Sequence, residues 1–162
     1  GGYALMRFSI LLQSLLMLIS MAGIFTTAIL CMRQTDLKAL IAMSSVSHMN
    51  LVVAATLVQT QWSYIGAILM MIAHGLTSSA LFCLANTTYE RTNSRTLTLL
   101  RGTMLLLPLA TTWWLTTLLL NLALPPSINF YAELLIMISL FNWSTAAFLL
   151  VTLNMIFTTA YT

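Results

Sequence analysis

Three ionisable side chains stand inside long stretches that otherwise carry no charge: His48, His74 and Glu133. An imidazole both donates and accepts hydrogen bonds and exchanges protons near neutral pH. A carboxyl group loads or releases a proton when its solvation changes. Ionisable groups are costly inside a membrane and usually serve a function there, so these residues are candidates for proton transfer.

Hydroxyl side chains lie one helical turn from each histidine, where they would share its face of a helix. They are Ser44 and Ser45 before His48, and Thr77 and Ser78 after His74. Such faces could hold ordered water beside an imidazole, so we treat the four hydroxyls as possible modulators. Lys38, near the start of a predicted helix, is either an interfacial anchor or a pathway residue.

Structural roles and metal binding are the alternatives for the ionisable residues. A membrane-embedded histidine can simply hydrogen-bond a neighbouring helix, and Glu133 can pair with an arginine or lysine. Two histidines and a glutamate can also bind a metal. They come from three separate predicted helices, however, without a ligand spacing such as HxxxH or ExxH. We therefore expect no metal site.

Hydrophobic residues make up 60% of the 162 residues and charged residues 6%, against about 25% charged in an ordinary soluble domain. The charge-free runs that are long enough to cross a membrane cover residues 8–32, 39–89, 102–132 and 134–162. Glu133 separates the last two of these runs. This composition excludes a soluble catalytic domain, a nucleotide-binding unit and a nucleic-acid-binding surface. It predicts an all-α, polytopic transmembrane helix bundle.

Polar breaks and prolines divide these runs into helices. The amides and hydroxyls of residues 59–63 separate two spans, and Pro125-Pro126 interrupts a third because consecutive prolines remove backbone donors. We expect spans at 13–32, 39–58, 63–89, 103–122 joined to 127–141 across the break, and 145–162, with 1–12 as the tail of a preceding helix. All belong to one membrane domain, 1–162, which we expect to be a fragment of a longer protein.

Basic residues predict the orientation of the helices. Arg33 and Lys38 lie in one predicted loop, and Arg91, Arg95 and Arg101 lie in another, two crossings later. Loops separated by two crossings share a side of the membrane, and basic residues collect on the inner side. Both loops should therefore lie at the same end of the bundle.

Several motifs carry a family resemblance, in order along nearly the whole chain. They include Arg33-Gln-Thr-Asp-Leu-Lys38, Ser44-Ser-Val-Ser-His-Met49, Met71-Ile-Ala-His-Gly-Leu-Thr-Ser-Ser79, Asn121-Leu-Ala-Leu-Pro-Pro126 and Glu133-Leu134. With these motifs the chain resembles part of the C-terminal half of the subunit 4 family of mitochondrial NADH:ubiquinone oxidoreductase (respiratory complex I). The resemblance implies an antiporter-like fold with interrupted helices, one of them at Pro125-Pro126.

The resemblance also implies a function and roles for single residues. The chain would belong to a core membrane subunit of a proton-pumping enzyme that transfers electrons from NADH to ubiquinone. His48 and His74 match histidines of a central proton pathway, and Glu133 matches a glutamate on its exit side. Lys38 matches the lysine of an Asp-x-Lys motif with a structural or modulatory role. On this hypothesis a proton passes between His48 and His74 and then to Glu133.

Cofactors and partners follow from the same resemblance. NADH, FMN, iron–sulfur clusters and ubiquinone are expected in partner subunits, and no cofactor is expected in this chain. The expected partners are the other complex I membrane subunits, including antiporter-like neighbours, together with the lipid bilayer and protons, but no nucleic acid. The expected location is the mitochondrial inner membrane, as a multi-pass protein. A stand-alone Na+/H+ antiporter-type subunit and a purely structural scaffold subunit remain as alternatives.

Overall fold

Apolar helices dominate the computed structural model, which describes residues 13–162. In order they are α2 (Gln13–Met32), α3 (Leu37–Val58), α4 (Gln61–Thr92), α5 (Thr103–Leu106), α6 (Pro108–Asn121), α7 (Ile128–Trp143) and α8 (Thr145–Tyr161). Within this range, extended pairing is limited to an isolated bridge between Asp36 and Thr96. The predicted all-α class is confirmed. The predicted helix tail at 1–12 lies outside the described residues.

Cap residues determine where several helices begin. Thr60 starts α4 with a capping box, in which its hydroxyl accepts from the Ser63 N–H at 3.2 Å and the Ser63 hydroxyl accepts from the Thr60 N–H at 3.0 Å. Gln59 adopts a left-handed conformation, with φ of 57°, and so ends α3 immediately before this cap. Ser127 and Ser144 cap α7 and α8 through their own hydroxyls.

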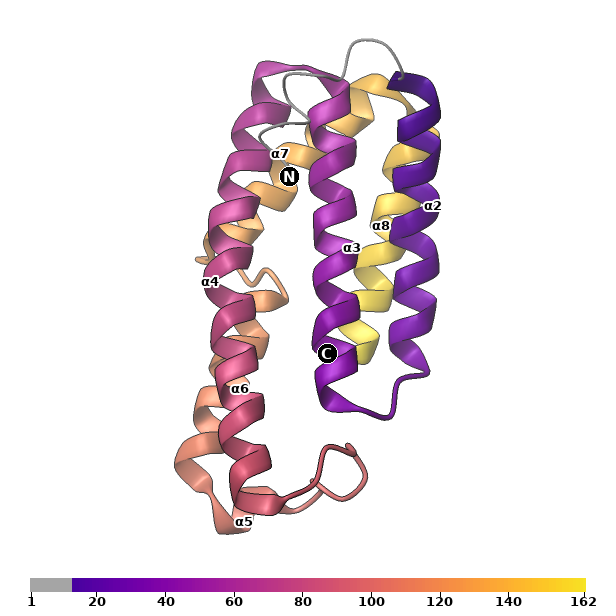
Figure 1. The fold of residues 1–162 in the computed structure, drawn as a ribbon. Coiled ribbons are helices and arrows are strands. Elements are labelled where there is room, and N and C mark those ends of the chain that lie inside the picture. Colours follow the sequence, from indigo (N-terminus) through magenta and orange to yellow (C-terminus); the bar gives the residue numbers. More distant parts are fainter. Residues whose placement is uncertain (1–12) are drawn as a thin grey trace.

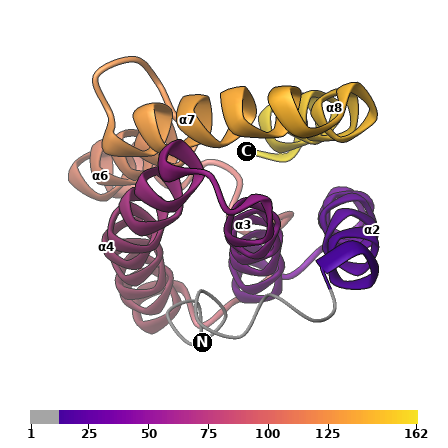
Figure 2. The same cartoon turned by 90° about the horizontal axis from the view of Figure 1, so that it is seen from above.

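Helix α3 occupies the middle of the bundle (Figure 1 and Figure 2). It packs against α2 on one side and α4 on the other, while α7 and α8 form a second layer beside them (Figure 2). Contacts join α4 to α7, α3 to α7 and α2 to α8. This arrangement brings together α3, α4 and α7, which are the helices that carry the buried ionisable residues.

Gly66 allows α4 and α7 to approach closely. A Cβ atom at this position would lie 3.0 Å from Ile136 Cγ1, 3.1 Å from Leu135 Cβ and 3.2 Å from the Ala132 carbonyl oxygen. Small residues serve such approaches in membrane proteins, where helix association depends on close packing. Ala132 and Ile136 are fully buried, so this contact helps to set the position of the neighbouring Glu133.

Helices α6 and α7 form the span that Pro125-Pro126 interrupts, because they end and begin on either side of the two prolines. The predicted interruption is therefore confirmed. The prediction of one continuous helix over 103–122 is wrong, since the structure divides this segment into α5 and α6 at Leu107. Pro108 is the physical reason. It disfavours the helical conformation at Leu107 and is well suited to the first position of a new helix.

The two loops rich in basic residues lie side by side at one end of the bundle (Figure 1). Main-chain hydrogen bonds join them: the Leu37 N–H donates to the Arg95 carbonyl at 3.1 Å, and the Leu97 N–H donates to the Thr35 carbonyl at 2.9 Å. The loops therefore share an end of the bundle, in agreement with the orientation that their charges predict.

Among the described residues, three helices are long and apolar enough to cross a membrane: Ser14–Met32, Leu37–Val58 and Gln61–Thr92. Helices α7 and α8 are shorter apolar helices. Large hydrophobic side chains such as Leu18 and Leu76 are exposed on the outside of the bundle, where lipid tails are as apolar as leucine itself. The chain is a multi-pass membrane protein.

Candidate proton-transfer site

The three ionisable side chains predicted from the sequence meet where α3, α4 and α7 come together. The ring centroids of His48 and His74 lie 4.9 Å apart, with their planes inclined by 35°. His48 Nδ1 lies 3.8 Å from Glu133 Oε1. His48 thus contacts both other groups and is the middle member of a row His74, His48, Glu133. The predicted transfer between His48 and His74 and on to Glu133 stays a prediction, in which His48 is the residue next to Glu133.

All three side chains are buried in the bundle. Their relative exposure is 6% for His48, 3% for His74 and 8% for Glu133. The fully buried Leu51 and Met70 lie one turn away on α3 and α4, so the surroundings are mainly apolar. A charge in such surroundings is strongly disfavoured unless it is paired or hydrogen-bonded. An ionised form of either group here therefore depends on pairing with the other.

Within the described chain, the side chain at ion-pair distance from Glu133 is that of His48 rather than of an arginine or lysine. The 3.8 Å separation of the two atoms exceeds a hydrogen-bond length of about 3 Å. A proton can therefore pass only after a small approach of the two groups or through a bridging water. Glu133 also borders a cavity of about 200 Å³, whose other lining residues include Leu134, Met137 and Met155.

Both ring nitrogens of His74 are buried and have no hydrogen-bond partner among the described residues. A histidine that is buried for structural reasons normally has such a partner. The interpretation of His74 as a residue that hydrogen-bonds a neighbouring helix therefore finds no support among residues 13–162, which the structure describes. Its neighbours Ala73 and Thr77 line a cavity of about 320 Å³ between α4 and the helix interruption.

The four hydroxyls near the histidines bond to carbonyls of their own helices, which is a common habit of serine and threonine in helices. The bonds are Ser44 Oγ to Ile41 at 2.8 Å, Ser45 Oγ to Ala42 at 2.6 Å, Thr77 Oγ1 to Ala73 at 3.2 Å and Ser78 Oγ to Gly75 at 3.4 Å. None of these four bonds reaches an imidazole. A modulatory role for these hydroxyls stays a prediction.

Lys38 lies at the loop end of α3, ten residues before His48 in the sequence, which corresponds to about 15 Å along a helix. Its Nζ lies 3.5 Å from Asn86 Oδ1 and 5.1 Å from the centre of the Tyr89 ring. The structure therefore does not bring Lys38 together with the buried row. Its position suits an anchor at the membrane surface, and a modulatory role stays a prediction.

Buried amides beside the site were not singled out from the sequence. Ser47 Oγ of α3 donates to Asn154 Oδ1 of α8 at 3.5 Å. Asn129, four residues before Glu133, donates from Nδ2 to the Leu120 carbonyl at 2.9 Å. An asparagine inside an apolar span is the sequence feature that could have indicated them, because such residues commonly hydrogen-bond across helices.

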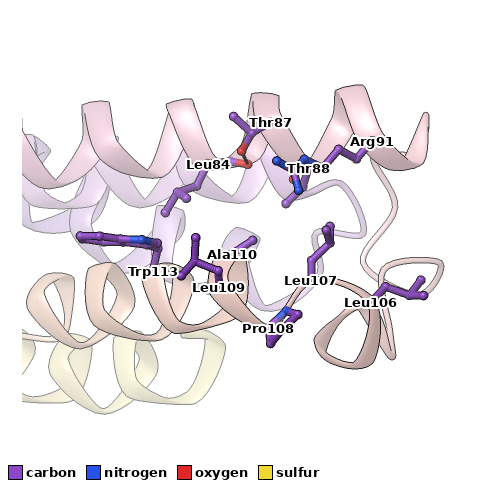
Figure 3. Close-up of a pocket in the computed structure, with 10 residues that line it drawn as sticks. All are labelled: Leu84, Thr87, Thr88, Arg91, Leu106, Leu107, Pro108, Leu109, Ala110 and Trp113. Carbon is purple, nitrogen blue, oxygen red and sulfur yellow. Dashed lines mark hydrogen bonds between the residues drawn. The ribbon is translucent and has the colours of Figure 1, made fainter.

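A separate groove of about 280 Å³ lies between the end of α4 and the helices α5 and α6, with Trp113 toward one end and Arg91 toward the other (Figure 3). Its lining contains none of the three ionisable residues of the row, so it is not part of the proton-transfer site. In the part of the chain that the structure describes, no group of three or more His, Cys, Asp and Glu residues could hold a metal ion.

The fold and the site together define a class of protein. A helical membrane bundle with an interrupted helix and protonatable groups at its centre has the architecture of antiporter-like ion transporters. The family model for NADH:quinone oxidoreductase/Mrp antiporter, TM, matches residues 1–158. The chain belongs to this family.

Curated relatives carry the name NADH-ubiquinone oxidoreductase chain 4. The relative from Struthio camelus is 54% identical over 169 residues, which cover 100% of this chain and 37% of the relative. The relative from Crotalus adamanteus is 51% identical over 168 residues, which cover 99% of this chain and 73% of the relative. The chain thus spans little more than a third of the Struthio camelus relative. The resemblance to subunit 4 is confirmed.

Two solved structures share the fold. A chain of respiratory complex I from Thermus thermophilus with bound NADH is 25% identical with a TM-score of 0.93, and the match covers 99% of this chain and 36% of that one. A chain of the Mrp complex from Dietzia sp. is 27% identical with a TM-score of 0.80, and the match covers 99% of this chain and 19% of that one. The antiporter-like fold is confirmed.

Proposed function

We propose that this chain is part of a core membrane subunit of proton-pumping NADH:ubiquinone oxidoreductase and carries part of its transmembrane proton pathway. The observation that supports this most strongly is the continuous contact from His74 through His48 to Glu133. The relatives named NADH-ubiquinone oxidoreductase chain 4 indicate the reaction to which the pathway is coupled. Electron transfer itself belongs to the whole complex.

The proposed pathway runs from His74 to His48 and from His48 to Glu133. After His74 has passed its proton to His48 and has taken up another, its positive charge disfavours the one on His48, because the two rings are in contact. This repulsion favours release of the His48 proton toward Glu133. The transfer occurs when the 3.8 Å gap shortens to hydrogen-bond length. Glu133 then releases the proton into the cavity beside it.

The proposed setting is the mitochondrial inner membrane, with other complex I membrane subunits as neighbours. NADH, FMN, iron–sulfur clusters and ubiquinone are assigned to partner subunits. Coupling would therefore reach this chain through protein contacts and electrostatics rather than through a bound redox group. Lipid and protons are its other partners.

Changing Glu133 to Gln in the intact complex tests this proposal. Glutamine keeps the size of the side chain but removes its titratable group, so proton pumping and coupled NADH oxidation should both fall at least about tenfold. Glu90→Gln is the matched control, because Glu90 is an exposed glutamate whose Oε1 accepts from Asn86 at the loop end of α4. Pumping should be measured per assembled complex in vesicles. Normal pumping by assembled Glu133→Gln complex would refute the proposal.

A stand-alone antiporter is the second candidate function. The observation that favours it is the fold shared with a chain of the Mrp complex. Such a transporter needs no redox partners. The complete parent chain can be reconstituted alone in vesicles under a pH gradient. Sodium-dependent proton movement without NADH would support the antiporter, whereas its absence together with NADH-driven pumping by the complex supports the proposal above.

A further inference from the structure

The Asn129 side chain bridges the interruption between α6 and α7. Its Nδ2 donates to the Leu120 carbonyl at 2.9 Å, across nine residues of sequence. Asn129 is 2% exposed, so water does not compete freely for this bond. The bond joins the last turn of α6 to the first turn of α7, although two prolines stand between the helices.

The interruption leaves the Leu120 carbonyl in need of a donor. In a continuous helix it would accept from the Leu124 N–H four residues later. Here the Leu124 N–H donates to the Leu119 carbonyl instead, at 3.4 Å, and Ala123 has a left-handed conformation with φ of 53°. A carbonyl without a hydrogen-bond partner is strongly unfavourable inside a membrane. The Asn129 amide satisfies this carbonyl.

Asn129 also shares a helix face with Glu133, because residues four apart on a helix are neighbours. Both side chains are buried. The hydrogen bond to Leu120 therefore restrains the turn of α7 that precedes Glu133, while the close contact of Gly66 with Ala132 restrains the turn that contains it. Both restraints act on α7 at or just before the residue whose carboxyl group faces His48.

We propose that Asn129 is a positioning residue that closes the break between α6 and α7 and thereby holds Glu133 within reach of His48. This inference rests on the proposed function, since it assigns Asn129 a role through Glu133. Asn129 itself transfers no proton. Its contribution is the bond from its amide to the Leu120 carbonyl.

The test uses Asn129→Leu in the intact complex, with assembly measured separately from pumping. Leucine approximates the volume of asparagine but cannot donate to Leu120. A single intramolecular hydrogen bond shifts an equilibrium by about fivefold, so pumping per assembled complex should fall about fivefold. Asn121→Ala is the control, because Asn121 is also a buried asparagine at the interruption. The Oδ1 atoms of both asparagines have no partner among the described residues, but the bond that joins α6 to α7 comes from the Nδ2 of Asn129. This control should pump normally.

A double-variant cycle separates positioning from general stability. If Asn129 acts through Glu133, Asn129→Leu should cause no additional loss of pumping when Glu133→Gln is already present. A multiplicative loss in the double variant would overturn the inference, and so would normal pumping by assembled Asn129→Leu complex. If Asn129→Leu fails to assemble, Asn129→Ser decides the question, since its shorter side chain leaves Leu120 without the amide donor.

The same set of variants distinguishes this inference from the proposed function. A pumping defect in Glu133→Gln with normal pumping in the Asn129 variants overturns only the positioning role. Normal pumping in Glu133→Gln overturns the proposed function, and the inference with it.

Discussion

Replacing Gly66 by alanine should force α4 and α7 apart where Gly66 lies against Ala132, the residue before Glu133. The added methyl carbon would meet Ile136 Cγ1 at 3.0 Å, Leu135 Cβ at 3.1 Å and the Ala132 carbonyl oxygen at 3.2 Å. Leu135 Cβ and the Ala132 oxygen cannot move away by a change of rotamer. The helices themselves must therefore shift by a few tenths of an ångström.

Gly75 on the same helix provides the reference for the magnitude. A Cβ atom there meets nothing within 4 Å, so Gly75→Ala should show only the helix preference of alanine, a gain of about 0.5–1 kcal/mol. Gly66→Ala has the same gain but adds an overpacking cost of about 1–3 kcal/mol. The two variants should therefore differ in stability by about 1–3 kcal/mol, with Gly66→Ala the less stable.

Thermal survival of the assembled complex measures this difference. Purified complexes carrying either variant are heated at one temperature, and the intact fraction is followed on native gels. The Gly66→Ala complex should lose its intact form faster than the Gly75→Ala complex. The subunit that carries this chain should dissociate or aggregate first. Equal half-lives for the two variants would refute the reasoning, because they would show that α4 and α7 accommodate a methyl group without cost.

Two further changes test other parts of the structure. Thr60→Ala removes one half of the capping box at the start of α4 and should destabilise the bundle by about 1 kcal/mol. In the same heating assay the control Thr98→Ala, at an exposed loop position, should have no effect. Equal survival of the two variants would contradict the role of the cap. His74→Leu replaces a ring whose nitrogens have no partner in the described chain, so the complex should assemble normally but lose pumping. Failure to assemble would instead assign His74 a structural role.

The buried row could be anticipated from the sequence because charge is so scarce in this chain. Helix faces that contact lipid and faces that contact other helices are both apolar here, so hydrophobic periodicity does not distinguish them. Polar and ionisable residues are then the markers of the inner face. His48, His74 and Glu133 were found in this way, and the structure places them in contact.

The order of the row and its supporting contacts could not be predicted in the same way. Which side chain touches which depends on how far α3, α4 and α7 are rotated and shifted relative to one another. Packing contacts such as Gly66 against Ala132 determine these offsets, and no local pattern encodes them. The partner of Asn129 depends likewise on the path of the chain around two prolines. A single proline such as Pro108 is compatible with a kink or with a new helix start, so it did not by itself predict the break at Leu107.

The bridge between the two basic loops has a consequence for mutational tolerance. Its bonds use only the N–H groups of Leu37 and Leu97 and the carbonyls of Thr35 and Arg95. These main-chain bonds therefore do not depend on which side chains stand at these positions, and proline is the substitution that removes a donor. At position 37, the first residue of α3, proline is otherwise well accepted. The start of α3 and the loop after α4 are thus joined by main-chain hydrogen bonds. A comparison of amino-acid variation among relatives would not reveal this connection.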